Sequence, residues 1–141
     1  MGSVKHKFQF DKILCDVPCS GDGATRKLPI KWSKWHTSDG MVLHPLQLSI
    51  LMKAINLLKK GGLLVYSTCS LNLIENEAVV NALFDKVGRG LELVDIHDMF
   101  GVKGRRGILK WDVSAISDKS YENENKDKPD GEKEIGKKFI K

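Results

Sequence analysis

The sequence predicts an α/β protein built on a mostly parallel sheet. Three short apolar segments alternate with two longer segments whose apolar residues recur at helical spacing. This order of strand, helix, strand, helix and strand is typical of right-handed crossovers onto a parallel sheet. Three strands and two helices form a small layer. We therefore expect one edge and part of one face of the sheet to be uncovered, as in one half of a doubly wound domain.

The first predicted strand covers residues 8–17. Its second half, residues 13–17, is apolar except for Asp16 and ends before Pro18, which is typical of a parallel strand buried on both faces. Residues 20–39 are glycine-rich and then basic, without a sustained period. We expect a functional loop there, with a short helical turn around Trp32 and Trp35.

The first predicted helix covers residues 43–58. Its expected buried side consists of Leu43, Leu46, Ile50, Ala54 and Leu57, and the polar residues between them are Gln47, Lys53 and Asn56. Pro45 is placed near the first turn, where a missing amide hydrogen costs nothing. The polar, glycine-containing run over residues 59–62 ends the helix.

A second buried strand is predicted over residues 63–66, and a third over residues 91–96. Between them, Asn72 and Glu75 have the spacing of a capping box, in which a side chain three residues into a helix returns to its N-cap. We therefore predict a helix over residues 74–87. Its apolar side consists of Val80, Leu83, Phe84 and Val87.

Length and charge suggest one incomplete domain followed by a tail. The chain has 141 residues and a net charge of +5, and residues 118–141 hold seven lysines and seven acidic residues. The whole positive excess therefore lies in residues 1–117, which we expect to form the domain. Residues 118–141 have little to bury, and we expect them to be mobile. A mild basic excess permits a nucleic acid partner without requiring one.

Cysteine content and hydropathy suggest where the protein resides. Three cysteines, an odd and low number, argue against a disulfide framework and favour a reducing, intracellular compartment. The chain has no run of 18 apolar residues, so no membrane-spanning segment is expected.

Two unusual segments follow the first two predicted strands, residues 16–23 and residues 67–70. Chemistry in open α/β sheets lies beyond the carboxyl ends of the strands. If these two strands are neighbours, Asp16, Cys19 and Cys69 converge at one place, as in a site for nucleophilic catalysis. Cysteines are also common as small buried apolar residues, and Cys15, inside the strand, is interpreted that way.

Other site classes fit the sequence less well. A zinc site would have to use Cys15, Cys19, Cys69, His36 and His44, which lack the ligand spacing of known zinc sites, so no metal is expected. Neither a Walker loop nor a GxGxxG motif is present.

The segments Ile-Leu-Cys-Asp-Val-Pro-Cys-Ser-Gly-Asp-Gly, residues 13–23, and Tyr-Ser-Thr-Cys-Ser, residues 66–70, resemble the Sun-domain family of RNA (cytosine-5) methyltransferases. The likeness extends over residues 10–111 and is greatest to the eukaryotic tRNA (cytosine-5) methyltransferase branch. It implies a partial Rossmann-like methyltransferase fold, namely the C-terminal half of the catalytic domain, within residues 1–117. It also implies S-adenosylmethionine as the cofactor and RNA as the substrate, with tRNA as the expected class of RNA.

The resemblance also implies the roles of the site residues. Cytosine C5 is too electron-poor to accept a methyl group until a thiolate adds to C6. The family places this nucleophile at Cys69 and assigns product release to Cys19, whereas chemistry alone leaves the two thiols interchangeable. Asp16 is expected to stabilise charge near N3 of the base and to lie against the methyl donor. The first amides of the following helix would favour a thiolate at Cys69.

The basic loop after the Pro-Cys motif is the expected RNA contact. Cations suit phosphates and indole rings suit base stacking, and the candidates are Arg26, Lys27, Lys31, Trp32 and Lys34. A solvated loop whose tryptophans cap the core is an equal alternative. A second basic stretch, residues 103–107, is interpreted as surface charge.

The sequence is thus interpreted as part of an RNA (cytosine-5) methyltransferase found in the nucleus or the cytoplasm. The family's glycine-rich cofactor loop belongs to strands that precede this segment, so the chain alone is expected to be inactive. A catalytically silent RNA-binding or scaffold module of the same fold is the alternative, and a thiol-redox protein is disfavoured because a CxxC motif is absent.

Overall fold

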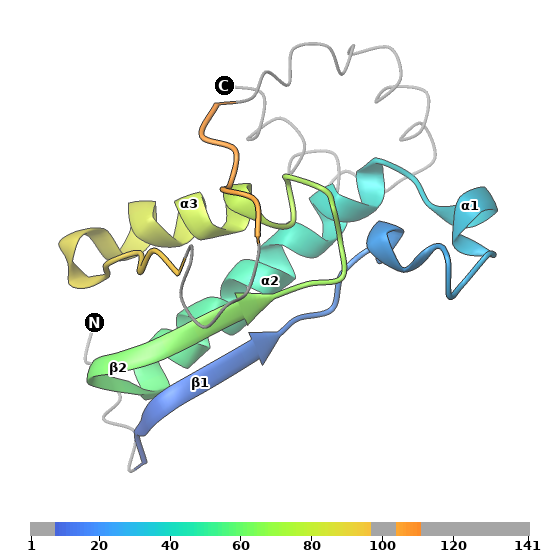
Figure 1. The fold of residues 1–141 in the computed structure, drawn as a ribbon. Helices are drawn as coiled ribbons and strands as arrows, with labels where there is room; N and C mark the ends of the chain where they lie inside the picture. Colours follow the sequence, from blue (N-terminus) through green and yellow to red (C-terminus); the bar gives the residue numbers. More distant parts are fainter. Residues whose placement is uncertain (1–7, 97–103, 111–141) are drawn as a thin grey trace, which may run out of the picture.

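The computed structural model describes residues 8–96 and 104–110, and it has the predicted α/β architecture (Figure 1). The elements follow in the order β1 (Phe10–Asp16), η1 (Asp22–Ala24), α1 (Lys31–Lys34), α2 (Ser38–Leu57), β2 (Leu58–Ser67), α3 (Glu77–Val87) and η2 (Gly88–Gly90). The predicted tail, residues 118–141, lies outside the described residues, so its expected mobility stays a prediction.

Two parallel strands form the sheet. β1 (Phe10–Asp16) pairs with β2 (Leu58–Ser67), with Cys15 opposite Tyr66 and Asp16 opposite Ser67. β2 begins five residues earlier than predicted because the helix that precedes it continues directly into the strand. A register irregularity near the start of the pair falls beside Gly61, whose φ is 77°, a backbone conformation that glycine adopts without strain.

The long helix α2 (Ser38–Leu57) connects the two strands, and its phase differs from the predicted one. Leu46, assigned to the buried side, is 46% exposed, whereas Gln47, assigned to the polar side, is 0% exposed. The helix also begins five residues earlier than predicted, so Pro45 lies inside it and cannot donate a backbone hydrogen bond there. The prediction failed because it counted only apolar residues as buried.

The second helix, α3 (Glu77–Val87), begins three residues later than predicted. Residues 73–76 form a turn instead of the first helical turn. The predicted third strand, residues 91–96, is not assigned as a strand in the described chain. An extended segment is a β-strand only if it pairs with a neighbouring strand. In the described sheet, β1 and β2 pair only with each other, so residues 91–96 have no partner strand there.

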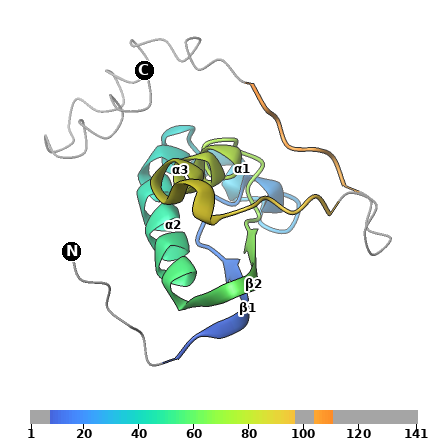
Figure 2. The ribbon, with the colours of Figure 1, turned by 90° about the vertical axis from the view of Figure 1, so that its left-hand side faces the viewer.

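The core lies between the sheet and the two long helices. It includes Cys15 and Val17 from the β1 segment, Leu51 from α2, and Val79 and Leu83 from α3. Figure 2 shows α2 running along one face of the strand pair. The opposite face exposes Phe10, Leu14, Leu63 and Val65, each more than half exposed. The expectation of a partly uncovered sheet is therefore confirmed.

None of the helices in the described residues combines the length and apolar character needed to cross a membrane.

Candidate active site

The two cysteine motifs meet at one edge of the sheet. β1 and β2 are parallel neighbours, so the segments that follow them leave the sheet at the same end, where α1 also lies (Figure 1). The Sγ atoms of Cys19 and Cys69 are 3.2 Å apart. Cys69 is exposed and Cys19 is half-buried. The convergence of these thiols was predicted from their positions after buried strands.

Asp16 is the last residue of β1 and lies at this same edge. Its side chain is exposed, on the sheet face that the helices do not cover. The Ser67 hydroxyl donates a hydrogen bond of 2.9 Å to Asp16 Oδ1, and Ser67 is the one side-chain partner that the described residues provide. The carboxylate therefore keeps further acceptor capacity toward solvent or a ligand.

The backbones of the two cysteine segments are in direct contact. The Gly23 amide donates to the carbonyl of Cys69 at 3.0 Å, and the Leu71 amide donates to Asp22 Oδ1 at 2.9 Å. A Cβ at Gly23 would lie 2.6 Å from the Cys69 carbonyl oxygen. Gly21, with φ at 73°, would place a Cβ 3.7 Å from Cys69 Sγ. Gly23 is thus required by the close approach of the Cys69 carbonyl, whereas Gly21 is favoured by its positive φ.

The thiols differ in their electrostatic environment. Burial raises the pKa of the Cys19 thiol, and its hydrogen bond with Cys69 raises this pKa further. Burial also raises the pKa of Cys15, which lies in the core as predicted. Cys19 is therefore a protonated thiol at neutral pH, whereas the exposed Cys69 is the sulfur that a substrate can reach.

A buried polar cluster beneath the thiols was not predicted as part of the site. Ser20 and Ser70, each directly after a cysteine, and Gln47 donate hydrogen bonds to the carboxylate of Glu75. The predicted capping box is wrong, because Glu75 points into this cluster. Asn72 Oδ1 instead accepts from the Ile74 amide at 3.0 Å.

Sequence reasoning missed Gln47 and His44 as well, although a signal existed. Both occur at helical spacing with Leu51 and Ala54, so they are polar residues on a buried stripe. His44 Nδ1 lies 2.8 Å from the Ile74 carbonyl oxygen, and burial lowers the pKa of His44. The neutral imidazole therefore donates to the segment that follows Cys69.

The basic loop forms a rim beside the thiols, with the predicted helical turn present as α1 (Lys31–Lys34). Arg26, Lys27 and Lys34 are exposed, and Trp32 is 77% exposed, which excludes it from the core. Two residues face inward instead.

The Lys31 ammonium group donates to the Ser20 carbonyl at 2.7 Å. Trp35 Nε1 donates to Ser20 Oγ at 2.9 Å. The loop is therefore attached to the residue after Cys19.

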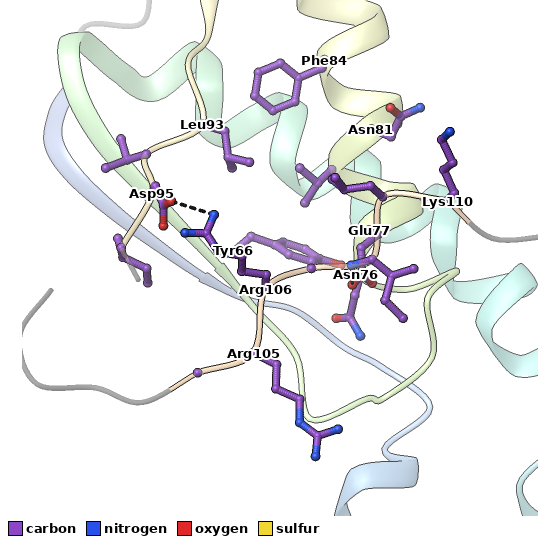
Figure 3. A pocket seen from close by; sticks show the side chains of 17 residues that line it. Tyr66, Asn76, Glu77, Asn81, Phe84, Leu93, Asp95, Arg105, Arg106 and Lys110 are labelled. Atoms are coloured by element: carbon purple, nitrogen blue, oxygen red, sulfur yellow. Dashed lines mark hydrogen bonds and ion pairs between the residues drawn. The ribbon is translucent and has the colours of Figure 1, made fainter. Parts of the chain in front are cut away.

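A pocket lies beside α3. Its volume is about 1220 Å³, and it is lined by α3 and by residues 93–96 and 104–110. Tyr66 lies at its base (Figure 3). Arg106, from the second basic stretch, pairs with Asp95 across it at 3.2 Å. Asp16, Cys19 and Cys69 do not line this pocket, which is therefore separate from the thiol site. Within residues 8–96 and 104–110, no three potential ligands gather as a metal site would require.

The chain matches the family described as 16S rRNA methyltransferase RsmB/F over residues 2–109. It is 52% identical over 106 residues to the multisite-specific tRNA:(cytosine-C(5))-methyltransferase of Saccharomyces cerevisiae, an alignment that covers 74% of this chain and 16% of the relative. The tRNA (cytosine(34)-C(5))-methyltransferase of Drosophila melanogaster is 49% identical over 108 residues, covering 76% of this chain and 14% of the relative.

A bacterial relative is more distant. The ribosomal RNA small subunit methyltransferase F of Aeromonas hydrophila is 42% identical over 91 residues, which cover 64% of this chain and 19% of the relative. The chain thus spans less than one fifth of the length of these curated relatives.

Proposed function

This chain belongs to the 16S rRNA methyltransferase RsmB/F family, and on that basis we propose a catalytic role for its cysteines. They would serve an S-adenosylmethionine-dependent RNA (cytosine-5) methyltransferase that acts on tRNA. The observation that supports this most is the pair of thiols 3.2 Å apart at the carboxyl ends of two parallel strands. The choice of tRNA follows the printed names of the eukaryotic relatives.

Cys69 is proposed as the nucleophile. Its exposed thiolate adds to C6 of cytosine, forming a sulfur–carbon bond and making C5 electron-rich. The exposure of Cys69 supports this choice, because the base must reach the sulfur from outside. S-adenosylmethionine supplies the methyl group that C5 then accepts.

Cys19 is proposed to serve release. After methyl transfer, the C5 proton must leave so that the bond between Cys69 and C6 can break. The Sγ atom of Cys19 lies 3.2 Å from Cys69 Sγ, which supports this role because the group that resolves the adduct must lie beside it.

Asp16 is the residue of this chain that fits the cofactor and the base. Its exposed carboxyl group accepts from Ser67 and retains acceptor capacity for a ligand. We propose that Asp16 lies against the methyl donor and near N3 of the cytosine. The remaining cofactor contacts are proposed to come from outside this chain, so the chain alone is inactive.

The rim of the site is proposed to bind the RNA. Exposed Arg26, Lys27 and Lys34 suit phosphates, and the exposed indole of Trp32 suits a flanking base, since the target cytosine must leave its stack. Lys31, predicted as a phosphate contact, is already bonded to the Ser20 carbonyl. It contributes charge from the base of the loop.

The cysteine content supports an intracellular compartment. The chain has three cysteines, an odd and low number, which favours a reducing environment. We place the protein in the nucleus or the cytoplasm.

Replacement of each cysteine in the full-length protein tests the proposal. Cys69→Ala should abolish both methylation and covalent capture of tRNA, because no thiolate attacks C6. Cys19→Ala should accumulate a covalent adduct, because attack proceeds and release fails. Denaturing gels with labelled tRNA measure the adduct, and transfer of labelled methyl groups measures the reaction.

Cys15→Ala is the matched control, since Cys15 lies in the core and should leave both readouts within a few-fold of the unaltered protein. An adduct with Cys69→Ala and none with Cys19→Ala would reverse the two roles. Tight tRNA binding without methyl transfer or adduct in the unaltered protein would favour the silent RNA-binding module.

A further inference from the structure

One buried carboxylate connects the two cysteine segments. Glu75 is 0% exposed and lies in the turn before α3. Its Oε2 accepts from the backbone amide of Ser20 at 2.8 Å, and its Oε1 accepts from the hydroxyl of Ser20. The hydroxyl of Ser70 donates to the same Oε1 at 2.8 Å. Since Ser20 follows Cys19 and Ser70 follows Cys69, Glu75 holds the residue next to each thiol.

Gln47 strengthens this connection from α2. Its side-chain amide is 0% exposed and donates to Glu75 Oε2 at 3.0 Å and to the Pro18 carbonyl at 2.9 Å. Both partners are acceptors, so the NH₂ group must face them. Cys19 is therefore held on both sides, through Pro18 before it and Ser20 after it.

The backbone of Glu75 is itself fixed. The Tyr66 hydroxyl donates to the Glu75 carbonyl at 2.5 Å. Burial raises the pKa of Tyr66, so the phenol remains a donor at all physiological pH values. Tyr66 belongs to β2, so this hydrogen bond connects the position of Glu75 to the strand that precedes Cys69.

We propose that Glu75 is a positioning residue that sets the separation and the relative orientation of the Cys19 and Cys69 thiols. The importance of Glu75 for methylation rests on the proposed function, whereas its effect on the positions of the two thiols does not depend on that function. A burial this complete is costly for a carboxylate unless donors surround it, and here four donors converge on two oxygens. Removing the carboxylate leaves the Ser20 amide and the Gln47 amide without this acceptor. The connection through Glu75 beneath the thiols is then lost, whereas the contacts of Gly23 and Asp22 with the Cys69 segment remain.

The test measures the thiol pair directly in the full-length protein. A trivalent arylarsenoxide condenses with two nearby thiols to give one As–S bond to each sulfur, and its oxygen leaves as water, with no oxidation or reduction. Peptide mass spectrometry gives the fraction of molecules bridged between Cys19 and Cys69. Single alkylation of each thiol by iodoacetamide serves as the measure of simple accessibility.

Glu75→Ala should lower the bridging rate at least tenfold relative to the single-alkylation rates. Glu75→Gln should lower it by a few-fold, because an amide can still accept from Ser20 and Gln47 through its oxygen. Its NH₂ group would then face Ser20 Oγ, which already accepts from Trp35. Glu77→Gln is the matched control, since Glu77 accepts from the Ile108 amide and contacts neither cysteine segment. It should bridge at the unaltered rate.

Thermal unfolding is measured first, and every reaction is run well below the melting temperature of each variant. If Glu75→Ala does not fold, Glu75→Gln decides the question. Bridging by a folded Glu75→Gln protein at the unaltered rate would overturn the proposal, as would the same result with folded Glu75→Ala.

Methyl transfer supplies a second readout, in which kcat should fall for Glu75→Gln while KM for tRNA stays within twofold. The arsenical reaction needs neither RNA nor methyl donor. It therefore decides the positioning role even if the unaltered protein fails to methylate RNA.

Discussion

At the scale of single residues, the thiol pair depends on a glycine that allows two backbones to touch. A Cβ at Gly23 would lie 2.6 Å from the Cys69 carbonyl oxygen, so Gly23→Ala must push the Cys69 segment away and break the 3.0 Å hydrogen bond to it. We expect a loss of about 1–3 kcal/mol in the free energy of unfolding, as for other overpacked sites. Urea denaturation measures it, and methyl transfer by the full-length protein should fall as well.

Gly104→Ala is the control, because a Cβ at Gly104 has open space around it. It should change the free energy of unfolding by less than about 0.5 kcal/mol. Equal stability and activity of Gly23→Ala and the unaltered protein would show that the two segments do not need this contact.

His44 should make stability depend on pH. Burial lowers its pKa from the usual 6.5, so below pH 6.5 the unfolded chain binds a proton that the folded chain resists. Its contribution is therefore fully present above pH 6.5 and is lost as the pH falls toward the folded-state pKa. Urea denaturation at pH 7.5 and pH 5 should show a smaller loss of stability at pH 5 for His44→Gln than for the unaltered protein.

The matched control is His36→Gln, since His36 is exposed and its replacement should change the free energy of unfolding at pH 7.5 by less than about 0.5 kcal/mol. An identical pH dependence in the unaltered protein and in His44→Gln would contradict the burial of a neutral imidazole.

Residue identity predicted that the two thiols converge but not which residues hold them. Cys19 and Cys69 were recognisable because each follows an apolar run, and parallel neighbours bring their ends together. Glu75 could not be recognised in this way. Its spacing of three residues from Asn72 is the same whether its side chain caps a helix or accepts a hydrogen bond from Ser20. That choice depends on contacts 55 residues apart in sequence, which a local pattern does not contain.

At the scale of elements, the two long helices and the first two strands were predictable, whereas the buried side of α2 and the third strand were not. The stripe of α2 that is buried includes His44 and Gln47, because their hydrogen-bond partners lie in the segments after the two strands. A prediction based on apolar residues alone therefore assigned the wrong side of α2 to the core. The predicted third strand, residues 91–96, failed for a related reason, since pairing depends on a neighbour that the segment itself does not supply.

The basic loop with α1 should contribute RNA affinity without contributing stability. A triple change of Arg26, Lys27 and Lys34 to Ala removes three exposed cations and leaves Lys31 on the Ser20 carbonyl. We expect weaker tRNA binding by the full-length protein and a shallower salt slope, by just under one unit for each lost phosphate contact. Thermal stability should hardly change, because solvated charges contribute little. Binding titrations at several salt concentrations measure both quantities.

The two tryptophans of this loop provide the control. Trp32→Ala should lower tRNA affinity at unchanged stability, since Trp32 is 77% exposed. Trp35→Ala should lower the melting temperature, because it removes the hydrogen bond to Ser20 Oγ. If the triple variant retains both the affinity and the salt slope, the loop charges serve only solubility.

At the scale of the whole molecule, the uncovered face of the sheet should limit cofactor binding by this chain alone. S-adenosylmethionine is the size of a typical small-molecule cofactor, and such ligands bind in concave sites that bury most of their surface. Asp16 instead lies on an open face beside Leu14 and Val65, which are 68% and 55% exposed. We therefore expect S-adenosylmethionine to bind the isolated 141-residue chain with a Kd weaker than about 1 mM, which corresponds to about 4 kcal/mol. Isothermal titration calorimetry measures the Kd, with Asp16→Asn as the matched variant.

Two outcomes would contradict this expectation. If the chain binds with a micromolar Kd, about 8 kcal/mol, and Asp16→Asn abolishes that binding, the edge of β1 already forms a closed pocket. Micromolar binding that survives Asp16→Asn would place the ligand elsewhere, with the hollow beside Tyr66 and Arg106 as the first region to examine.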